Sequence, residues 1–275
     1  MADLNGTTFA AEIQAAGADL DPVRANLLLA REIAYPDLRP EESWLQIDDL
    51  RAAAQPVLLG TDQPALALAH FLSERAGFRG DREHYHDPRN SYLNDVLERR
   101  LGLPISLSVL YVTLARGLGL RAFGVGLPGH FVAGVELNGE RVLLDPFNGG
   151  RTLSPADCQQ LVEQATGHAG PLNPRWLKPT AGRDIVARML NNLRASYMEL
   201  EAWAPAIRAM ERLRLLQPEQ PTHLRDLGLL HYKTGAHHLA AEHLGHYLAL
   251  APNAPDAEDI RRSRQLLLDE GARWN

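Results

Sequence analysis

The sequence contains a single cysteine, Cys158, and no long apolar run. One thiol excludes an internal disulfide and any metal site built from several cysteines, and it fits a reducing compartment. No stretch approaches the roughly 18 apolar residues of a membrane span, and the first residues lack a positive segment followed by an apolar one. We therefore expect a cytoplasmic protein that does not associate with membranes.

An excess of positive charge is also absent. The 275 residues carry a net charge of −6, and acidic and basic residues are interspersed along the chain. Because no basic stripe is available to follow a phosphate backbone, we expect no nucleic-acid partner. With 45% hydrophobic residues, the chain has enough apolar surface to bury at least one full core.

Three zones follow one another along the sequence. Residues 1–100 are predicted to be helical, with apolar residues at helical spacing in 22–34, 40–53, 63–75 and 91–100. Residues 101–166 combine an apolar helix, 105–118, with a strand at 120–127 and a hairpin, which indicates an α+β core. A segment rich in glycine and proline, 167–182, is predicted to be a linker, and residues 183–275 form a separate helical domain.

The last zone contains a repeat with a period of 34 residues. At this offset similar residues recur, as in Leu190 and Leu224, Leu193 and Leu227, Ala206 and Ala240, Met210 and Leu244, Leu216 and Leu250, and Pro218 and Pro252. This is the spacing of tetratricopeptide repeats, although Arg194 replaces a usual glycine and His231 a usual aromatic residue. Two copies need support from neighbouring structure, and we expect a last helix near 256–268 to provide part of it. Such repeats lead us to expect a protein or peptide partner.

The hairpin is predicted from Asn138-Gly139, the residue pair that favours a two-residue turn. Counting outward pairs Leu137 with Glu140, and eventually Val132 with Asp145. His130 and Asp145 then share a face as diagonal neighbours, within reach of a hydrogen bond. They form either a catalytic His–Asp pair or a purely structural one beside the Asp145-Pro146 turn.

A nucleophile for this pair would have to come from the preceding helix. In "RLGLPISLSVLYVTLARGLGL", Pro104 fits the first helical turn and places Ser106 and Ser108 there. A helix start favours a nucleophile through its positive dipole end. The alternative is that Ser106 caps the helix and Ser108 lies in the core.

These residues resemble a known family. A nucleophile at a helix start, then "ARGLGLRAFGVGL", then His130 and Asp145 on successive strands is similar to the transglutaminase-like superfamily, in the papain-like order Cys, His, Asp. The run from "DPRNSYLNDVLERR" to "LLDPFNGGRTLSPADC" more closely resembles the bacterial sirB-operon, invasion-regulator-type family. That resemblance implies a transglutaminase-like α+β core followed by all-α tetratricopeptide repeats.

The sequence departs from active transglutaminases at the nucleophile, since the position near Ser106 holds no cysteine. Cys158 lies beyond Asp145 in the chain, and we interpret it as a packing residue. We therefore expect a cytoplasmic regulatory or scaffolding protein with a degenerate triad. The alternative is a serine-dependent acyl transferase or peptidase that uses Ser106, His130 and Asp145. The histidine-rich segments 82–90 and 237–246 lack metalloprotease spacing, and we expect neither a metal nor a cofactor.

Overall fold

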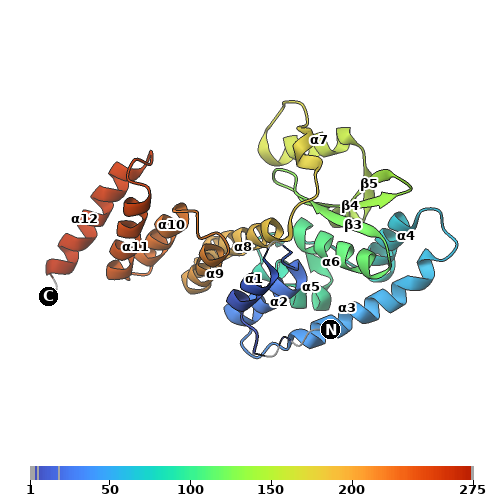
Figure 1. The fold of residues 1–275 in the computed structure, drawn as a ribbon, viewed down its shortest axis with the longest axis horizontal. Helices are drawn as coiled ribbons and strands as arrows, with labels where there is room; N and C mark the ends of the chain where they lie inside the picture. Colours follow the sequence, from blue (N-terminus) through green and yellow to red (C-terminus); the bar gives the residue numbers. More distant parts are fainter. Residues whose placement is uncertain (1–3, 5, 18, 274–275) are drawn as a thin grey trace. The chain divides into compact units, whose positions relative to one another are not determined.

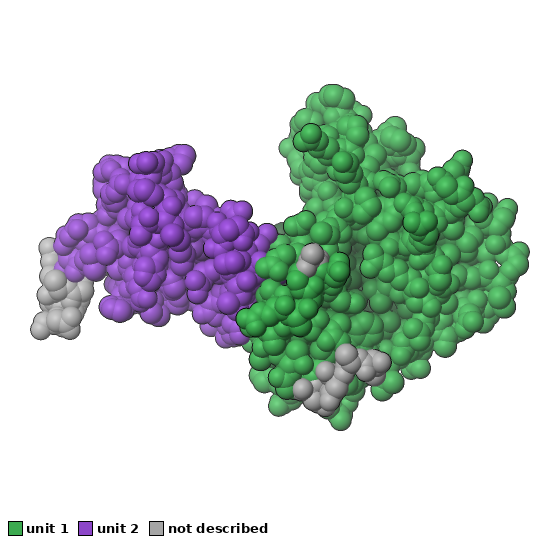
Figure 2. Space-filling view, viewed as in Figure 1, with its two compact units in different colours: residues 1–189 green, residues 190–275 purple. Residues whose placement is uncertain are grey.

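The computed structural model describes residues 4, 6–17 and 19–273. The chain divides into two compact units, residues 1–189 and 190–275, which Figure 2 shows in separate colours. The division falls inside helix α8 (Gly182–Glu199), whereas the sequence led us to expect the repeat domain to begin at residue 183. The α+β fold class followed by all-α repeats is confirmed.

The first hundred residues are mainly helical, as predicted. The longer elements are α1 (Phe9–Ala16), α2 (Pro22–Ile33), α3 (Pro40–Ala54), α4 (Pro64–His70) and α5 (Leu93–Arg99). Short turns of 3-10 helix, η1 (Gln55–Leu58) and η3 (Pro88–Asn90), lie between them. The expected helix 63–75 changes to a π-helical turn, η2 (Phe71–Arg75), and a short parallel pair, β1 (Arg79–Gly80) and β2 (Leu101–Gly102), has no signal in the sequence pattern.

The centre of this unit is a helix packed against a sheet (Figure 1). Helix α6 (Pro104–Gly117) is buried along most of its length, which fits its nearly uniform apolar sequence. The antiparallel sheet has the order β3 (Arg121–Val125), β4 (Val132–Leu137), β5 (Glu140–Asp145), β6 (Arg151–Leu153). Ala133 and Leu144 face α6, while Val132 and Leu143 face α7 (Pro155–Thr166) on the other side.

The predicted hairpin register is confirmed. Leu137 pairs with Glu140 and Gly134 with Leu143, around a turn whose residues Asn138 and Gly139 both have positive φ. The ladder ends one position earlier than expected, at Ala133 and Leu144. Asp145 thus stands at the end of its strand, where a short 3-10 turn, η4 (Pro146–Asn148), begins.

Residues 167–182, which we expected to be a linker, pack along the sheet. They include a 3-10 turn, η5 (Pro174–Leu177), in which Trp176 joins the apolar cluster on the α7 side. Thr180 binds the edge of β3, because its amide donates to the carbonyl of Gly124 at 2.9 Å and its hydroxyl accepts from the amide of Gly126 at 2.9 Å. This segment therefore contributes to the first unit.

The second unit consists of antiparallel helical hairpins. It contains the end of α8, then α9 (Trp203–Leu216), α10 (Thr222–Lys233), α11 (His237–Leu250) and α12 (Ala257–Arg273). Ala206 and Ala240, equivalent in the two repeats, are both fully buried. A Cβ atom added to Gly228 would lie 2.7 Å from Leu244, so the small residue permits close contact between α10 and α11. In the described part of the chain, no helix is both long and apolar enough to cross a membrane.

Candidate functional site

The hairpin brings His130 and Asp145 together. The Nε2 atom of His130 lies 3.0 Å from Oδ2 of Asp145, so the predicted hydrogen bond is confirmed. The Asp145 side chain is fully buried and the His130 side chain is 10% exposed. Since Nε2 faces the carboxylate, Nδ1 is the ring nitrogen that remains for a reacting group.

Asn148 completes the surroundings of the carboxylate. Its side-chain amide donates to Asp145 Oδ2 at 2.6 Å, and its main-chain amide donates to Oδ1 at 3.3 Å. Burial raises the pKa of Asp145, but the hydrogen bonds and charge of His130, together with those from Asn148, outweigh burial and hold this pKa below its ordinary value. The carboxylate is therefore ionised and can orient the imidazole.

An aromatic ring contacts the imidazole of His130, and a second ring lies behind the first. The ring of Phe147 meets it edge-on, with centroids 6.1 Å apart, and Tyr85 in turn lies 6.3 Å from Phe147. The guanidinium of Arg82 lies 5.7 Å from the Phe147 centroid and also binds Asn148. Gly80 makes room for this arrangement, because a Cβ atom there would lie 2.5 Å from the Phe147 ring.

Arg188, which lies on α8, holds the main chain of His130 in place. Its guanidinium donates to the carbonyl oxygens of Leu127 at 2.8 Å and His130 at 2.9 Å, and it covers the Phe131 ring at 5.3 Å. Burial lowers the pKa of Arg188 from its ordinary value. These contacts hold His130 just before strand β4, at a position that the pairing of β4 with β5 does not reach.

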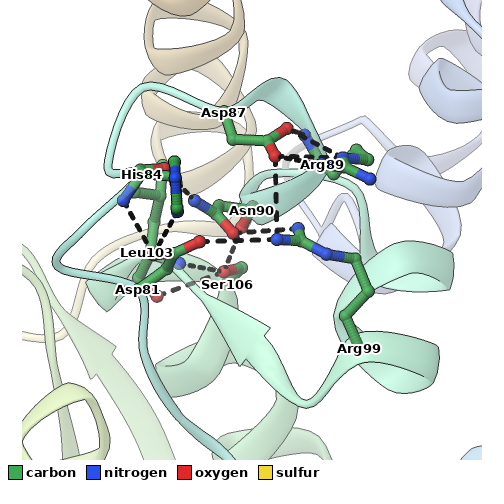
Figure 3. Close-up of polar contacts among 8 residues, drawn as sticks. All are labelled: Asp81, His84, Asp87, Arg89, Asn90, Arg99, Leu103 and Ser106. Atoms are coloured by element: carbon green, nitrogen blue, oxygen red, sulfur yellow. Dashed lines mark hydrogen bonds and ion pairs between the residues drawn. The ribbon is translucent and has the colours of Figure 1, made fainter.

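Ser106 belongs to a different set of hydrogen bonds (Figure 3). Its fully buried hydroxyl donates to the carbonyl of Asn90 at 2.7 Å and accepts from the amide of Leu103 at 2.9 Å. The contact with Leu103 is that of a capping residue at the helix start. Among the described residues, no hydrogen bond joins Ser106 to His130. The contacts therefore match the alternative in which Ser106 caps the helix.

The same network extends from Asn90 into the loop 81–90 (Figure 3). Asn90 donates to the carbonyl of His84 at 2.7 Å and accepts from Arg99 at 3.0 Å. Arg99 also lies 3.4 Å from Asp81, whose carboxylate accepts the amide of His84 at 2.9 Å. The network thus fixes the loop that carries Arg82 and Tyr85.

The hydroxyl of Ser108 and the thiol of Cys158 lie in separate environments. Ser108 is fully buried and donates to the carbonyl of Phe131 at 3.2 Å, on the sheet side of α6. Cys158 is fully buried on the opposite side of the sheet, and burial, followed by the charges of Asp157 and Asp145, raises the pKa of its thiol to about 11. A protonated, enclosed thiol is typical of a packing residue.

Several contacts of the site were not predicted from the sequence. Asn148 lies three residues after Asp145 in "DPFNGG", a turn signal that could have indicated a side chain folding back on the strand end. Arg188 and Tyr85 reach the site from distant segments, for which the sequence offers no spacing rule. In the described residues, no group of three or more histidine, cysteine or acidic side chains converges on a possible metal position.

Comparison with known protein families agrees with this geometry. Residues 42–191 match the model of the transglutaminase-like superfamily, and residues 193–265 match a tetratricopeptide repeat model. The chain belongs to the transglutaminase-like superfamily. Its central helix α6, the His130–Asp145 hairpin and the loop 81–90 all lie within the matched residues.

The relatives cover most of the chain. A UPF0162 protein of Xylella fastidiosa (strain Temecula1) is 36% identical over 250 residues, which are 87% of this chain and 88% of the relative. A UPF0162 protein of Vibrio cholerae is 32% identical, over 71% of this chain and 77% of the relative. Protein SirB1 of Salmonella typhimurium is 27% identical, over 87% of this chain and 90% of the relative. The resemblance to the sirB-operon family is confirmed.

Proposed function

We propose that this protein is a cytoplasmic regulator or scaffold that binds a protein partner through its repeat unit. The observation that carries this proposal is an apolar groove of about 200 Å³ on that unit. The net charge of −6 favours a protein partner over a nucleic acid, and the single buried thiol fits a reducing compartment.

The groove lies between α10 and α12. Leu229 and Tyr232 of α10 line it with Leu266 of α12, and Leu244 of α11 contributes to its lining. Leu229, Tyr232 and Leu266 are 43%, 51% and 64% exposed, although each is a large hydrophobic side chain. Clustered exposed apolar residues indicate an interaction surface, and a groove between helices suits a peptide with apolar side chains at helical spacing.

The transglutaminase-like unit supports the same proposal. A serine nucleophile needs a hydrogen bond to its base, whereas the Ser106 hydroxyl is used by two main-chain groups. We therefore propose that Ser106 has an architectural role, and that the pocket around His130 is a degenerate triad site.

The groove can be tested with two matched substitutions. Leu266→Arg places a charge in the groove, and Leu250→Arg places one at an equally open position, 63% exposed, that does not line it. We expect a partner captured from a bacterial lysate by the wild-type chain to be lost with Leu266→Arg and kept with Leu250→Arg. Calorimetry with the purified partner then measures the change in Kd. Equal binding by both variants would exclude the groove.

A serine-dependent acyl transferase or peptidase is the second candidate, because His130 and Asp145 form the base half of a triad. A fluorophosphonate probe separates the two. We expect no labelling of Ser106, since its hydroxyl is enclosed and already bonded. Labelling at Ser106 that disappears in His130→Ala would establish the enzyme instead, because only a serine activated by a base reacts in this way.

A further inference from the structure

Two histidines are stacked between helices of the second repeat. The rings of His231 on α10 and His243 on α11 are nearly parallel, with an interplanar angle of 10° and centroids 5.2 Å apart. His231 occupies the position that Tyr197 holds in the preceding repeat. A packing position that is aromatic in one repeat is therefore titratable in the other.

The charged groups around the pair differ between the two rings. His231 interacts electrostatically with Glu211 of α9. His243 interacts electrostatically with Arg214 of α9 and with Glu242 and His246 of α11. Burial lowers the pKa of His231, and burial followed by the neighbouring His231 lowers that of His243. On the remaining neighbour, α12, Arg264 is bound to the Ala241 carbonyl at 3.0 Å, against the face of α11 that carries Ala241 and Gly245.

One ring nitrogen of the pair is enclosed without a partner. Nδ1 of His243 is buried and has no hydrogen bond among the described residues. A neutral imidazole tolerates this, because the proton can sit on Nε2 and leave Nδ1 as an acceptor. A protonated imidazole places a donor at Nδ1, where no acceptor is available, so protonation requires the surroundings of this ring to change.

We propose that the stacked His231–His243 pair is a pH-sensitive contact, and that its protonation on mild acidification loosens α10 from α11. Two neutral rings stack favourably, whereas a proton on His243 creates an unsatisfied donor and protons on both rings add repulsion between two cations. The direction in which stability changes with pH follows from the lowered pKa values of the two histidines. The unfolded chain binds protons more readily than the folded one, so stability is complete above about pH 6.5 and falls as the pH drops below it.

The contact adjoins the apolar groove of this unit. Tyr232 and Leu244, which line the groove, are the chain neighbours of His231 and His243. Loosening the pair would therefore also weaken partner binding below about pH 6.5. This consequence rests on the proposed function, whereas the pH-sensitive contact does not.

Hydrogen exchange of the full chain at pH 7.5 and 5.5 tests the contact without any partner. After correction for the intrinsic pH dependence, we expect amides of α10 and α11 to exchange faster at pH 5.5, by a factor on the order of ten. His231→Phe keeps an aromatic ring and removes one of the two titrating groups, so it should reduce the difference. His238→Gln removes an exposed histidine of α11, the helix of His243, and should leave the difference unchanged.

Exchange that is independent of pH in the wild-type chain, or equally dependent in His231→Phe, would overturn the proposal. Should His231→Phe fail to fold, NMR titration of the wild-type imidazoles decides instead. Both rings must then titrate below about pH 6.5, with coupled shifts, and ordinary titration of either ring contradicts the mechanism.

Discussion

The hydroxyl of Ser106 donates a hydrogen bond of 2.7 Å to the carbonyl oxygen of Asn90. This bond joins the start of the central helix to the end of the loop 81–90, and it is buried on both sides. A residue that the sequence offered as a nucleophile thus connects two parts of the first unit.

Ser106→Ala should lower the free energy of unfolding, and we expect no catalytic activity to depend on this hydroxyl. The substitution leaves the Asn90 carbonyl and the Leu103 amide with one fewer partner in a buried environment, at a cost of about 1–3 kcal/mol. Urea unfolding measures the loss. Ser73→Ala is a suitable control, since that hydroxyl only bonds back to the carbonyl of Ala69 one turn earlier and its removal should cost less than about 0.5 kcal/mol. Equal losses in the two variants would contradict the structural role of Ser106.

Asp145→Asn should change the dependence of stability on pH. Because the folded-state pKa of Asp145 lies below its ordinary value, its contribution is present above about pH 3.9 and is lost as the pH falls through the folded value. We expect the variant to lose about 1–3 kcal/mol at pH 6, and this difference to shrink toward pH 3. Urea unfolding of both proteins across this range measures it, and a constant difference would argue against an ionised Asp145.

Ala206→Leu and Ala240→Leu should each cost about 1–3 kcal/mol, because both positions are fully buried between helices and an added isobutyl group overpacks them. Ala204→Leu and Ala249→Leu introduce the same group at exposed positions of the same helices. Thermal unfolding compares the pairs. An unchanged midpoint in both buried variants would contradict the assigned contacts between repeat helices.

Gly80→Ala should disturb the ring beside His130. The new methyl group would lie 2.5 Å from Phe147, so the ring must move or the protein must lose roughly 1–3 kcal/mol. Phe147→Leu in the same chain provides space and should recover part of the loss, which a double-mutant cycle measures as a coupling energy. Additive effects of the two substitutions would show that the contact is unimportant.

The hairpin and the repeats could be predicted from the sequence because local rules determine them. Asn138 and Gly139 specify the turn, and a side-chain period of two then fixes which residues share a face with His130. The 34-residue offset likewise places Ala206 and Ala240 at equivalent positions.

The hydrogen-bond partner of the Ser106 side chain could not be predicted in the same way. The sequence places it in the first turn of α6, but its partner Asn90 arrives through the pairing of β1 with β2, each only two residues long. Arg188 reaches His130 from α8, which is separated from the hairpin by the segment 167–182. Contacts of this kind depend on tertiary packing, and a periodic pattern contains no information about them.

Cys158 has a practical consequence for experiments on this chain. It is the sole cysteine of the sequence, it is fully buried, and its pKa of about 11 keeps it protonated near neutral pH. Thiol reagents need a thiolate and access, so the native protein should react with them only slowly. A cysteine introduced at an exposed position, such as that of Ala204 on α9, would then be the one site that a maleimide dye or spin label modifies.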